Sequence, residues 1–293
     1  MTRLGFGASG PWAERWFDED RAYAVLRAGI EAGIRDVDTG PSYARGHAEL
    51  RLGRLLARLA EDGLPQPRVS GKVGTKLGLG GRAIKDFGRD AIHRQLDGSL
   101  AALGRPALDV LYLHGPDKHQ LASAIPILNE LQESGRIKAI GVCADGPHVR
   151  VAMRTDGVGW IMAPYSALAP HNAKLLAKAG RLGRKVCVVA PLGQALWRPE
   201  LVRPRTRAEA WYAGRALLRQ RSALRAARTA DWLHGVPDWP PADLALAFVW
   251  RTLAPDLILT TTTKPDHIRQ SAAAMTRDVP EGVAAMLAAR VKT

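Results

Sequence analysis

Short apolar runs alternate with helical segments along almost the whole chain. Eight runs of strand length occur at residues 3–6, 34–38, 69–72, 110–114, 139–142, 160–163, 186–190 and 257–260. Between them, apolar residues recur at helical spacing over 18–32, 47–59, 89–103, 121–133, 147–154, 172–182 and 265–275, and a final helix is expected over 281–291. Such alternation is typical of a parallel sheet whose strands are joined by crossover helices.

The number of strand–helix units separates two kinds of α/β fold. Eight units within 293 residues predict a closed (β/α)8 barrel, known as a TIM barrel. An open, doubly wound sheet is the alternative, but no Gly-x-Gly-x-x-Gly sequence lies directly between a strand and a helix. We therefore expect one barrel domain over residues 1–293.

One connection is much longer than the others. Residues 194–241 separate the seventh run from the last barrel helix, which is too long for an ordinary loop between a strand and a helix. The part over 205–234 has helical spacing of apolar residues and is flanked by prolines. Two interpretations stay open for this segment. It forms a lid or cofactor clamp at the barrel mouth, or it is a surface helix that extends the outer ring.

Composition excludes several classes of protein. Cys143 and Cys187 are the only cysteines, and both lie in apolar runs, which argues against a disulfide framework and a cysteine metal site. The sequence has no secretory signal and no apolar run of about 20 residues, so we expect a cytoplasmic protein without a membrane partner. The net charge of +14 is mostly arginine spread along the chain, and we expect no nucleic-acid partner and no metal site.

Polar residues stand where consecutive runs end. Asp38, Lys72 and His114 close the second, third and fourth runs, and Tyr43 follows Asp38 by five residues. The carboxyl ends of the strands in such a barrel line one common mouth, where polar side chains are typically catalytic. These four residues are therefore the catalytic candidates.

The four side chains suit proton transfer to a carbonyl oxygen. A tyrosine is a weak acid, and a neighbouring ammonium such as that of Lys72 lowers its pKa. Asp38 can hold Lys72 charged and oriented, and His114 can donate a hydrogen bond to a substrate oxygen as negative charge develops. None of the four donates hydride, so a nicotinamide cofactor would be needed for reduction.

The same residues belong to longer motifs that resemble the aldo-keto reductase superfamily. The segments that carry the resemblance are Asp38-Thr39-Gly40-Pro41-Ser42-Tyr43 with Glu49, then 100–104 through 109–114, then Gly141-Val142, Ala190-Pro191-Leu192-Gly193 and 244–247. The resemblance covers nearly the whole chain. It implies a (β/α)8 barrel, NADPH or in some members NADH as cofactor, and Asp38, Tyr43, Lys72 and His114 as the catalytic tetrad with Tyr43 as general acid.

The resemblance also indicates the cofactor-binding positions, many of which hold altered residues. The usual Ser-Asn pair for the nicotinamide carboxamide is Cys143-Ala144, the usual glutamine is Met162, and the usual stacking tyrosine is Val189. His267 and Ser271 replace an arginine and an asparagine near the adenosine 2′-phosphate. The full set of cofactor-binding candidates is Cys143, Met162, Pro191, Leu192, Gly193, Thr261, Thr262, Lys264, His267, Arg269 and Ser271.

Three functions are compatible with these residues. The first is NAD(P)H-dependent reduction of an aldehyde or ketone, or the reverse oxidation, with a small carbonyl compound or alcohol as the partner. The second is cofactor-free acid–base chemistry on a carbonyl compound, motivated by the apolar Ala144, Met162 and Val189. The third is a non-catalytic regulatory barrel like the auxiliary potassium-channel subunits of the superfamily. Trp12, Trp16 and Trp197 are candidates to wall a substrate pocket.

Overall fold

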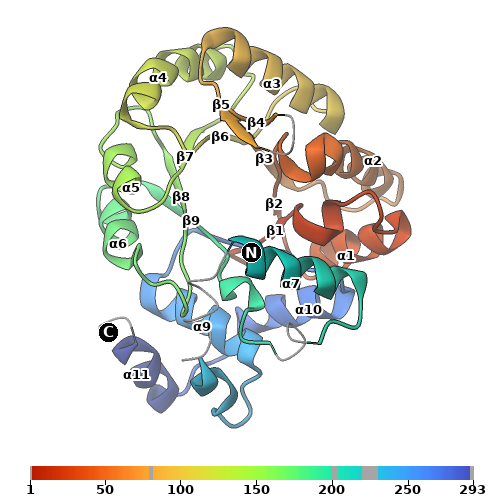
Figure 1. Ribbon diagram of the computed structural model, residues 1–293, viewed down its shortest axis with the longest axis vertical. Helices are drawn as coiled ribbons and strands as arrows, with labels where there is room; N and C mark the ends of the chain where they lie inside the picture. The colour runs from red at the N-terminus through yellow and green to blue at the C-terminus, as the bar shows by residue number, and fades with distance from the viewer. Residues whose placement is uncertain (1, 79–81, 199–202, 220–229, 291–293) are drawn as a thin grey trace.

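The computed structural model describes residues 2–78, 82–198, 203–219 and 230–290. Eight parallel strands close into a barrel in the order β1-β10-β9-β8-β7-β6-β3-β2, surrounded by helices (Figure 1). The barrel strands are β1 (Leu4–Gly7), β2 (Asp36–Asp38), β3 (Arg68–Val73), β6 (Val110–His114), β7 (Ile140–Cys143), β8 (Trp160–Pro164), β9 (Lys185–Val189) and β10 (Leu257–Thr260). The predicted (β/α)8 barrel is confirmed, apart from small shifts at the strand ends.

The helices form the outer ring (Figure 1). They are α1 (Glu19–Glu31), α2 (His47–Glu61), α3 (Arg89–Leu103), α4 (Lys118–Glu133), α5 (Pro147–Ala152), α6 (Ala173–Arg181), α9 (Pro241–Leu253) and α10 (Pro265–Ala274), and α11 (Glu281–Ala289) packs on the outside of α9. Their starts follow the local sequence. The Asp18 carboxylate accepts a hydrogen bond from the Arg21 N–H at 2.8 Å, which caps α1, and Asp117 with Gln120 forms a capping box at α4.

Strand register places the polar strand ends at one level of the barrel. Asp38 lies opposite Ser70, Lys72 lies opposite Tyr112, and His114 lies opposite Cys143. Because the strands are parallel, their carboxyl ends share one face of the barrel, and the side chains at those ends converge there.

The glycine-rich segment between β3 and α3 is partly regular. It contains an antiparallel hairpin of β4 (Thr75–Leu77) and β5 (Ala83–Lys85), with Thr75 opposite Lys85. The Gly78 N–H donates to the Arg82 carbonyl at 2.8 Å, which closes the hairpin toward its tip. Strands of three residues are too short for alternation to reveal them, so the sequence pattern did not predict this hairpin.

The long connection after β9 also differs from its prediction. Instead of one helix over 205–234, the structure has α7 (Arg207–Arg219) and a 3-10 helix, η6 (Asp231–His234); the stretch 220–229 lies outside the described residues. Ala230 and Leu233 are buried, and the tight 3-10 turn brings Leu233 into the core. In the described ranges, no helix is long and apolar enough to cross a membrane.

Candidate active site

The four polar residues at the strand ends meet in one cavity. Asp38, Tyr43, Lys72 and His114 all line a cavity of about 640 Å³ at the carboxyl end of the barrel. This volume lies within the roughly 300–1,000 Å³ that is usual for small-molecule and cofactor sites. The convergence expected from the sequence is therefore present in the structure.

A buried ion pair lies at the base of this cavity. The Lys72 ammonium donates hydrogen bonds to the Asp38 carboxylate and, at 3.0 Å, to the Thr39 carbonyl. The second carboxylate oxygen of Asp38 accepts a hydrogen bond from the Ser70 hydroxyl at 2.8 Å. Each charged group thus has a hydrogen-bonding partner in addition to the other member of the pair, as buried charges need.

Tyr43 is held by an unusual turn between β2 and α2. It begins η2 (Tyr43–Gly46), in which Ala44 and Arg45 have φ of 47° and 57°, the left-handed region that residues with a Cβ rarely adopt. The Lys72 Nζ lies 4.9 Å from the centre of the Tyr43 ring. The rings of Tyr43 and His114 are 6.4 Å apart at 89°, so the phenol and the imidazole meet edge to face.

The surroundings of these groups shift their pKa values. Burial raises the pKa of Tyr43 to about 12, although the charge of Lys72 acts in the opposite direction. Burial alone lowers the pKa of Lys72, but the charge of Asp38, together with Tyr43, Cys143 and the hydrogen bond to Asp38, outweighs it, and the net pKa lies above the ordinary value. Burial, followed by the charges of Lys72 and Lys85, lowers the pKa of His114 to about 3. At neutral pH the phenol is thus protonated, the amine charged and the imidazole neutral.

This result corrects one detail of the sequence prediction. Lys72 was expected to make Tyr43 more acidic than a free tyrosine, but burial of the phenol outweighs the charge of the ammonium. The arrangement keeps the tyrosine protonated, as a proton donor requires.

A second part of the cavity lies along the turn from β10 into α10. Lys264, His267, Gln270 and Ser271 line it, at the i, i+3 and i+4 spacing of one helix face. Thr261 and Thr262 also line the cavity. The Thr261 hydroxyl donates to the Gly7 carbonyl at 2.8 Å, so its proton is engaged within the barrel.

The side of the cavity toward β7, β8 and β9 is apolar. Met162 and Val189 line it, and Met162 is fully buried among Tyr112, Cys187, Leu257 and Leu259. Cys143 lines the cavity as well, and burial raises the pKa of its thiol to about 11, so the thiol is protonated at neutral pH. Ala144 is buried and does not line the cavity.

Pro191 and Leu192 line the cavity, whereas two of the cofactor-binding candidates do not. Gly193 is buried, with φ of 55°, and a Cβ there would lie 2.7 Å from the Leu168 side chain. Arg269 points outward and pairs with Asp266 at 3.1 Å. Neither Gly193 nor Arg269 lines the cavity in this structure, and their role as cofactor contacts stays a prediction.

Sequence reasoning did not name the residues of α7 that line the cavity. Glu209, Tyr212 and Arg215 of this helix line the cavity, as do Ser9 and Gly10 after β1. The Arg207 guanidinium of α7 stacks over the Trp16 ring at 4.7 Å, so the helix lies on the loop between β1 and α1. The length of the 194–241 connection signalled a large element at the mouth, but nothing in the sequence indicated which residues face inward.

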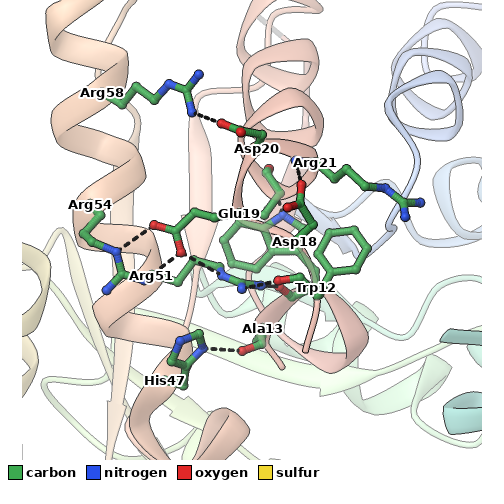
Figure 2. A network of polar contacts seen from close by, with 12 residues as sticks. Trp12, Ala13, Asp18, Glu19, Asp20, Arg21, His47, Arg51, Arg54 and Arg58 are labelled. Atoms are coloured by element: carbon green, nitrogen blue, oxygen red, sulfur yellow. Dashed lines mark hydrogen bonds and ion pairs between the residues drawn. The ribbon is translucent and has the colours of Figure 1, made fainter. Parts of the chain in front are cut away.

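The loop between β1 and α1 is fastened to α2 (Figure 2). The buried Arg51 guanidinium donates to the Trp12 carbonyl and, at 2.5 Å, to the Phe17 carbonyl, and His47 Nδ1 contacts the Ala13 carbonyl at 2.9 Å. Trp12 is fully buried, so it belongs to the core and is not a pocket wall. Of the three tryptophans proposed from the sequence as pocket walls, only Trp197 lines the cavity.

The described residues contain no group of three or more His, Cys, Asp or Glu side chains that could hold a metal ion. The candidate site therefore consists of the buried ion pair, the phenol, the imidazole and the cavity that joins them to the β10–α10 turn.

Comparison with known proteins gives consistent results. The chain is 25% identical over 98% of its length to an NADH-specific methylglyoxal reductase from Escherichia coli (strain K12), covering 94% of that protein. It is 36% identical to a D-threo-aldose 1-dehydrogenase from a Pseudomonas species, but over 48% of this chain and 50% of that protein. The chain thus aligns with only half the length of the second relative.

Solved structures share the fold. Aldo-keto reductase AKR11C1 from Bacillus halodurans, in its holo form, superimposes with a TM-score of 0.77 at 21% identity, over 99% of this chain and 91% of that one. An aldo/keto reductase from Klebsiella pneumoniae in complex with NADP and acetate gives a TM-score of 0.70 at 23% identity, over 97% and 89%.

A sequence model described as "Aldo/keto reductase family" matches residues 3–290, nearly the whole chain. This match confirms the resemblance that the motifs around Asp38 and His114 indicated. The protein thus belongs to the aldo/keto reductase family of oxidoreductases.

Proposed function

We propose that this protein uses NADPH or NADH to reduce an aldehyde or ketone to an alcohol, or catalyses the reverse oxidation, with Tyr43 as general acid. The observation that carries the proposal is the position of the Tyr43 phenol beside the Lys72–Asp38 ion pair, in a cavity large enough for a cofactor and a small substrate. The substrate is a small molecule with a carbonyl or alcohol group.

Each side chain has a role that follows from its position. Tyr43 donates its hydroxyl proton to the carbonyl oxygen as negative charge develops there. Lys72, held charged by Asp38, stabilises the phenolate that remains, because its ammonium lies 4.9 Å from the ring centre. The neutral His114 imidazole donates a hydrogen bond to the same substrate oxygen and orients it.

The residues of the second part of the cavity fit a phosphorylated dinucleotide. Lys264 and His267 face this region together with Thr262 and Ser271, so a cation and several hydrogen-bonding groups surround it. The amino-terminal end of α10, which begins at Pro265, adds the partial positive charge of a helix start. A bound nicotinamide would supply the hydride that the carbonyl carbon accepts.

One observation favours a second candidate function. Met162 and Val189 make one side of the cavity apolar and leave few groups there that could anchor a carboxamide. Such a pocket also suits cofactor-free acid–base chemistry on a carbonyl compound, in which Tyr43 and Lys72 move protons without hydride transfer.

Titration with NADPH and with NADH, followed by fluorescence and calorimetry, separates the two candidates. The reductase proposal predicts saturable binding of at least one cofactor. Turnover should then be measured with methylglyoxal, aldoses and a panel of other aldehydes and ketones. The absence of binding at millimolar cofactor would exclude the reductase and favour acid–base chemistry.

The role of Tyr43 is tested by a substitution that removes only its hydroxyl group. Tyr43→Phe is expected to lower the turnover number at least roughly 100-fold, the usual contribution of a general acid, with cofactor affinity unchanged. Tyr165→Phe is the matched control, because Tyr165 lies outside the cavity and hydrogen-bonds Thr252 at 2.7 Å. Turnover by Tyr43→Phe at the wild-type rate would contradict the assignment.

A further inference from the structure

The β4–β5 hairpin contacts the backbone of His114 at the end of β6. The Thr75 hydroxyl donates to the His114 carbonyl oxygen at 2.9 Å, and the Lys85 ammonium donates to the same oxygen. Thr75 and Lys85 lie directly opposite each other in the hairpin, so strand pairing brings both donors to one acceptor. Two side chains from outside the barrel thus hold one carbonyl of the candidate active site.

The base of the hairpin is itself fixed to the protein. The Asp86 N–H donates to the Gly74 carbonyl at 3.0 Å, and the Gly74 N–H donates to the Gln95 side chain of α3 at 3.1 Å. The Phe87 ring is buried against Gly74, where a Cβ would lie 2.0 Å from the ring. Because Thr75 and Lys85 adjoin this base, both donors start from anchored backbone.

The chain leaves His114 through a turn that fits closely under Lys85. Gly115 has φ of 70°, its N–H donates to the Cys143 carbonyl at 2.8 Å, and a Cβ there would lie 2.8 Å from the Lys85 Nζ. Glycine at position 115 thus suits the left-handed backbone conformation and leaves room for the close approach of the ammonium.

We propose that Lys85, together with Thr75, is a positioning residue that fixes the backbone of His114 and thereby aims its imidazole at the substrate oxygen. This inference rests on the proposed reductase function. The imidazole meets the Tyr43 ring edge to face at 6.4 Å, and a shift of the His114 backbone would move the imidazole relative to the phenol. Misplacement of a catalytic group by about 1 Å costs as much as roughly 100-fold in rate.

The charge of Lys85 acts on the same imidazole. The titratable groups around His114 are Lys72 of β3, Tyr43 of η2, Cys143 of β7 and Lys85 of β5. Burial lowers the pKa of His114 first, and then the charges of Lys72 and Lys85 lower it further. Lys85 therefore favours the neutral imidazole as well as holding its backbone.

The test replaces Lys85 by methionine and by arginine. Lys85→Met is expected to lower the turnover number for carbonyl reduction roughly ten-fold with the KM for cofactor unchanged, because only the imidazole is misplaced. Lys85→Arg keeps a cationic donor and should restore most of the rate. Lys76→Met is the matched control, since Lys76 is an exposed lysine on the same hairpin.

A second measurement does not depend on turnover. In histidine-labelled protein without substrate or cofactor, Lys85→Met should shift the NMR signals of the His114 ring, assigned by their loss in His114→Gln, whereas Lys76→Met should not. If the reductase proposal fails, this spectrum still tests the contact. Unchanged His114 signals in Lys85→Met would overturn the inference. An effect of Lys85→Met that is confined to a higher KM for substrate would also overturn it, because Lys85 would then bind substrate directly.

Discussion

The Lys72 ammonium and the Asp38 carboxylate form an ion pair inside the barrel, with side-chain exposures of only 2% and 5%. The pair joins two neighbouring strands, β3 and β2, directly beneath the Tyr43 ring. Charges so far from water are tolerated because each has further hydrogen-bonding partners, the Thr39 carbonyl for Lys72 and the Ser70 hydroxyl for Asp38. Under the proposed function, stability and chemistry would therefore depend on the same two residues.

Removing one member of this pair should destabilise the fold. Lys72→Met leaves the Asp38 carboxylate buried without its counter-charge, and we expect a loss of about 3–5 kcal/mol in the free energy of unfolding. The double variant Lys72→Met/Asp38→Asn removes both charges and should recover most of that loss. Urea unfolding near neutral pH measures both variants, and equal stability of the single and double variants would contradict the prediction.

The two directions of the reaction should respond differently to pH. Reduction needs the protonated phenol, and with the Tyr43 pKa raised to about 12 this form dominates across the neutral range. The rate of reduction at saturating substrate should be nearly constant between about pH 6 and about pH 9. Oxidation needs the phenolate and should rise about ten-fold per pH unit there. A decline of reduction near neutral pH would assign the proton to another group.

A buried carboxyl group near the site should make stability depend on pH. Glu49 of α2 accepts a hydrogen bond from the Ser99 hydroxyl of α3 at 2.9 Å, and burial raises its pKa from 4.5 to about 7. Between these two values the unfolded chain ionises while the folded protein stays protonated. Stability is therefore lost as the pH rises through this window, by up to about 3 kcal/mol.

Substitution of Glu49 should remove this dependence. Glu49→Gln keeps the oxygen that accepts from Ser99, and its free energy of unfolding should exceed that of wild type near pH 8 and match it near pH 4. Glu61→Gln, an exposed position on the same helix, is the control and should show no such difference. Urea unfolding at the two pH values measures both variants, and parallel pH profiles of wild type and Glu49→Gln would refute the idea.

The apolar side of the cavity should be improvable as a cofactor site. Met162→Gln places an amide at a position that lines the cavity, and one added hydrogen bond of about 1 kcal/mol should tighten cofactor binding roughly five-fold. Ala144→Asn is the control, because Ala144 does not line the cavity and its substitution should not tighten binding. Calorimetric titration gives both dissociation constants, and an unchanged value for Met162→Gln would place the nicotinamide elsewhere.

The barrel could be predicted because each strand has a strong, repeated signal. Asp38, Lys72 and His114 could be placed for the same reason: a polar residue at the end of a parallel strand points to the common mouth. The β4–β5 hairpin could not, since its strands are too short for periodicity, and with it the contacts of Thr75 and Lys85 were missed.

The sequence also could not predict in which direction a side chain points, or which of two opposing effects on a pKa is larger. The inward face of α7, including Tyr212, depends on how that helix lies on the β1–α1 loop. The outward course of Arg269 depends on its pairing with Asp266. The pKa of Tyr43 depends on how deeply the ring is buried relative to its distance from Lys72, and a linear pattern carries neither quantity.

The left-handed turn at Ala44 and Arg45 has a thermodynamic consequence. Each of these residues is held in a conformation about 1–2 kcal/mol less favourable than a right-handed one. That energy is supplied once, when the protein folds, and the phenol of Tyr43 then needs little further ordering in each catalytic cycle. Under the proposed function, turnover would begin from a proton donor whose orientational entropy is already lost, so no binding energy of the substrate would be needed to order it.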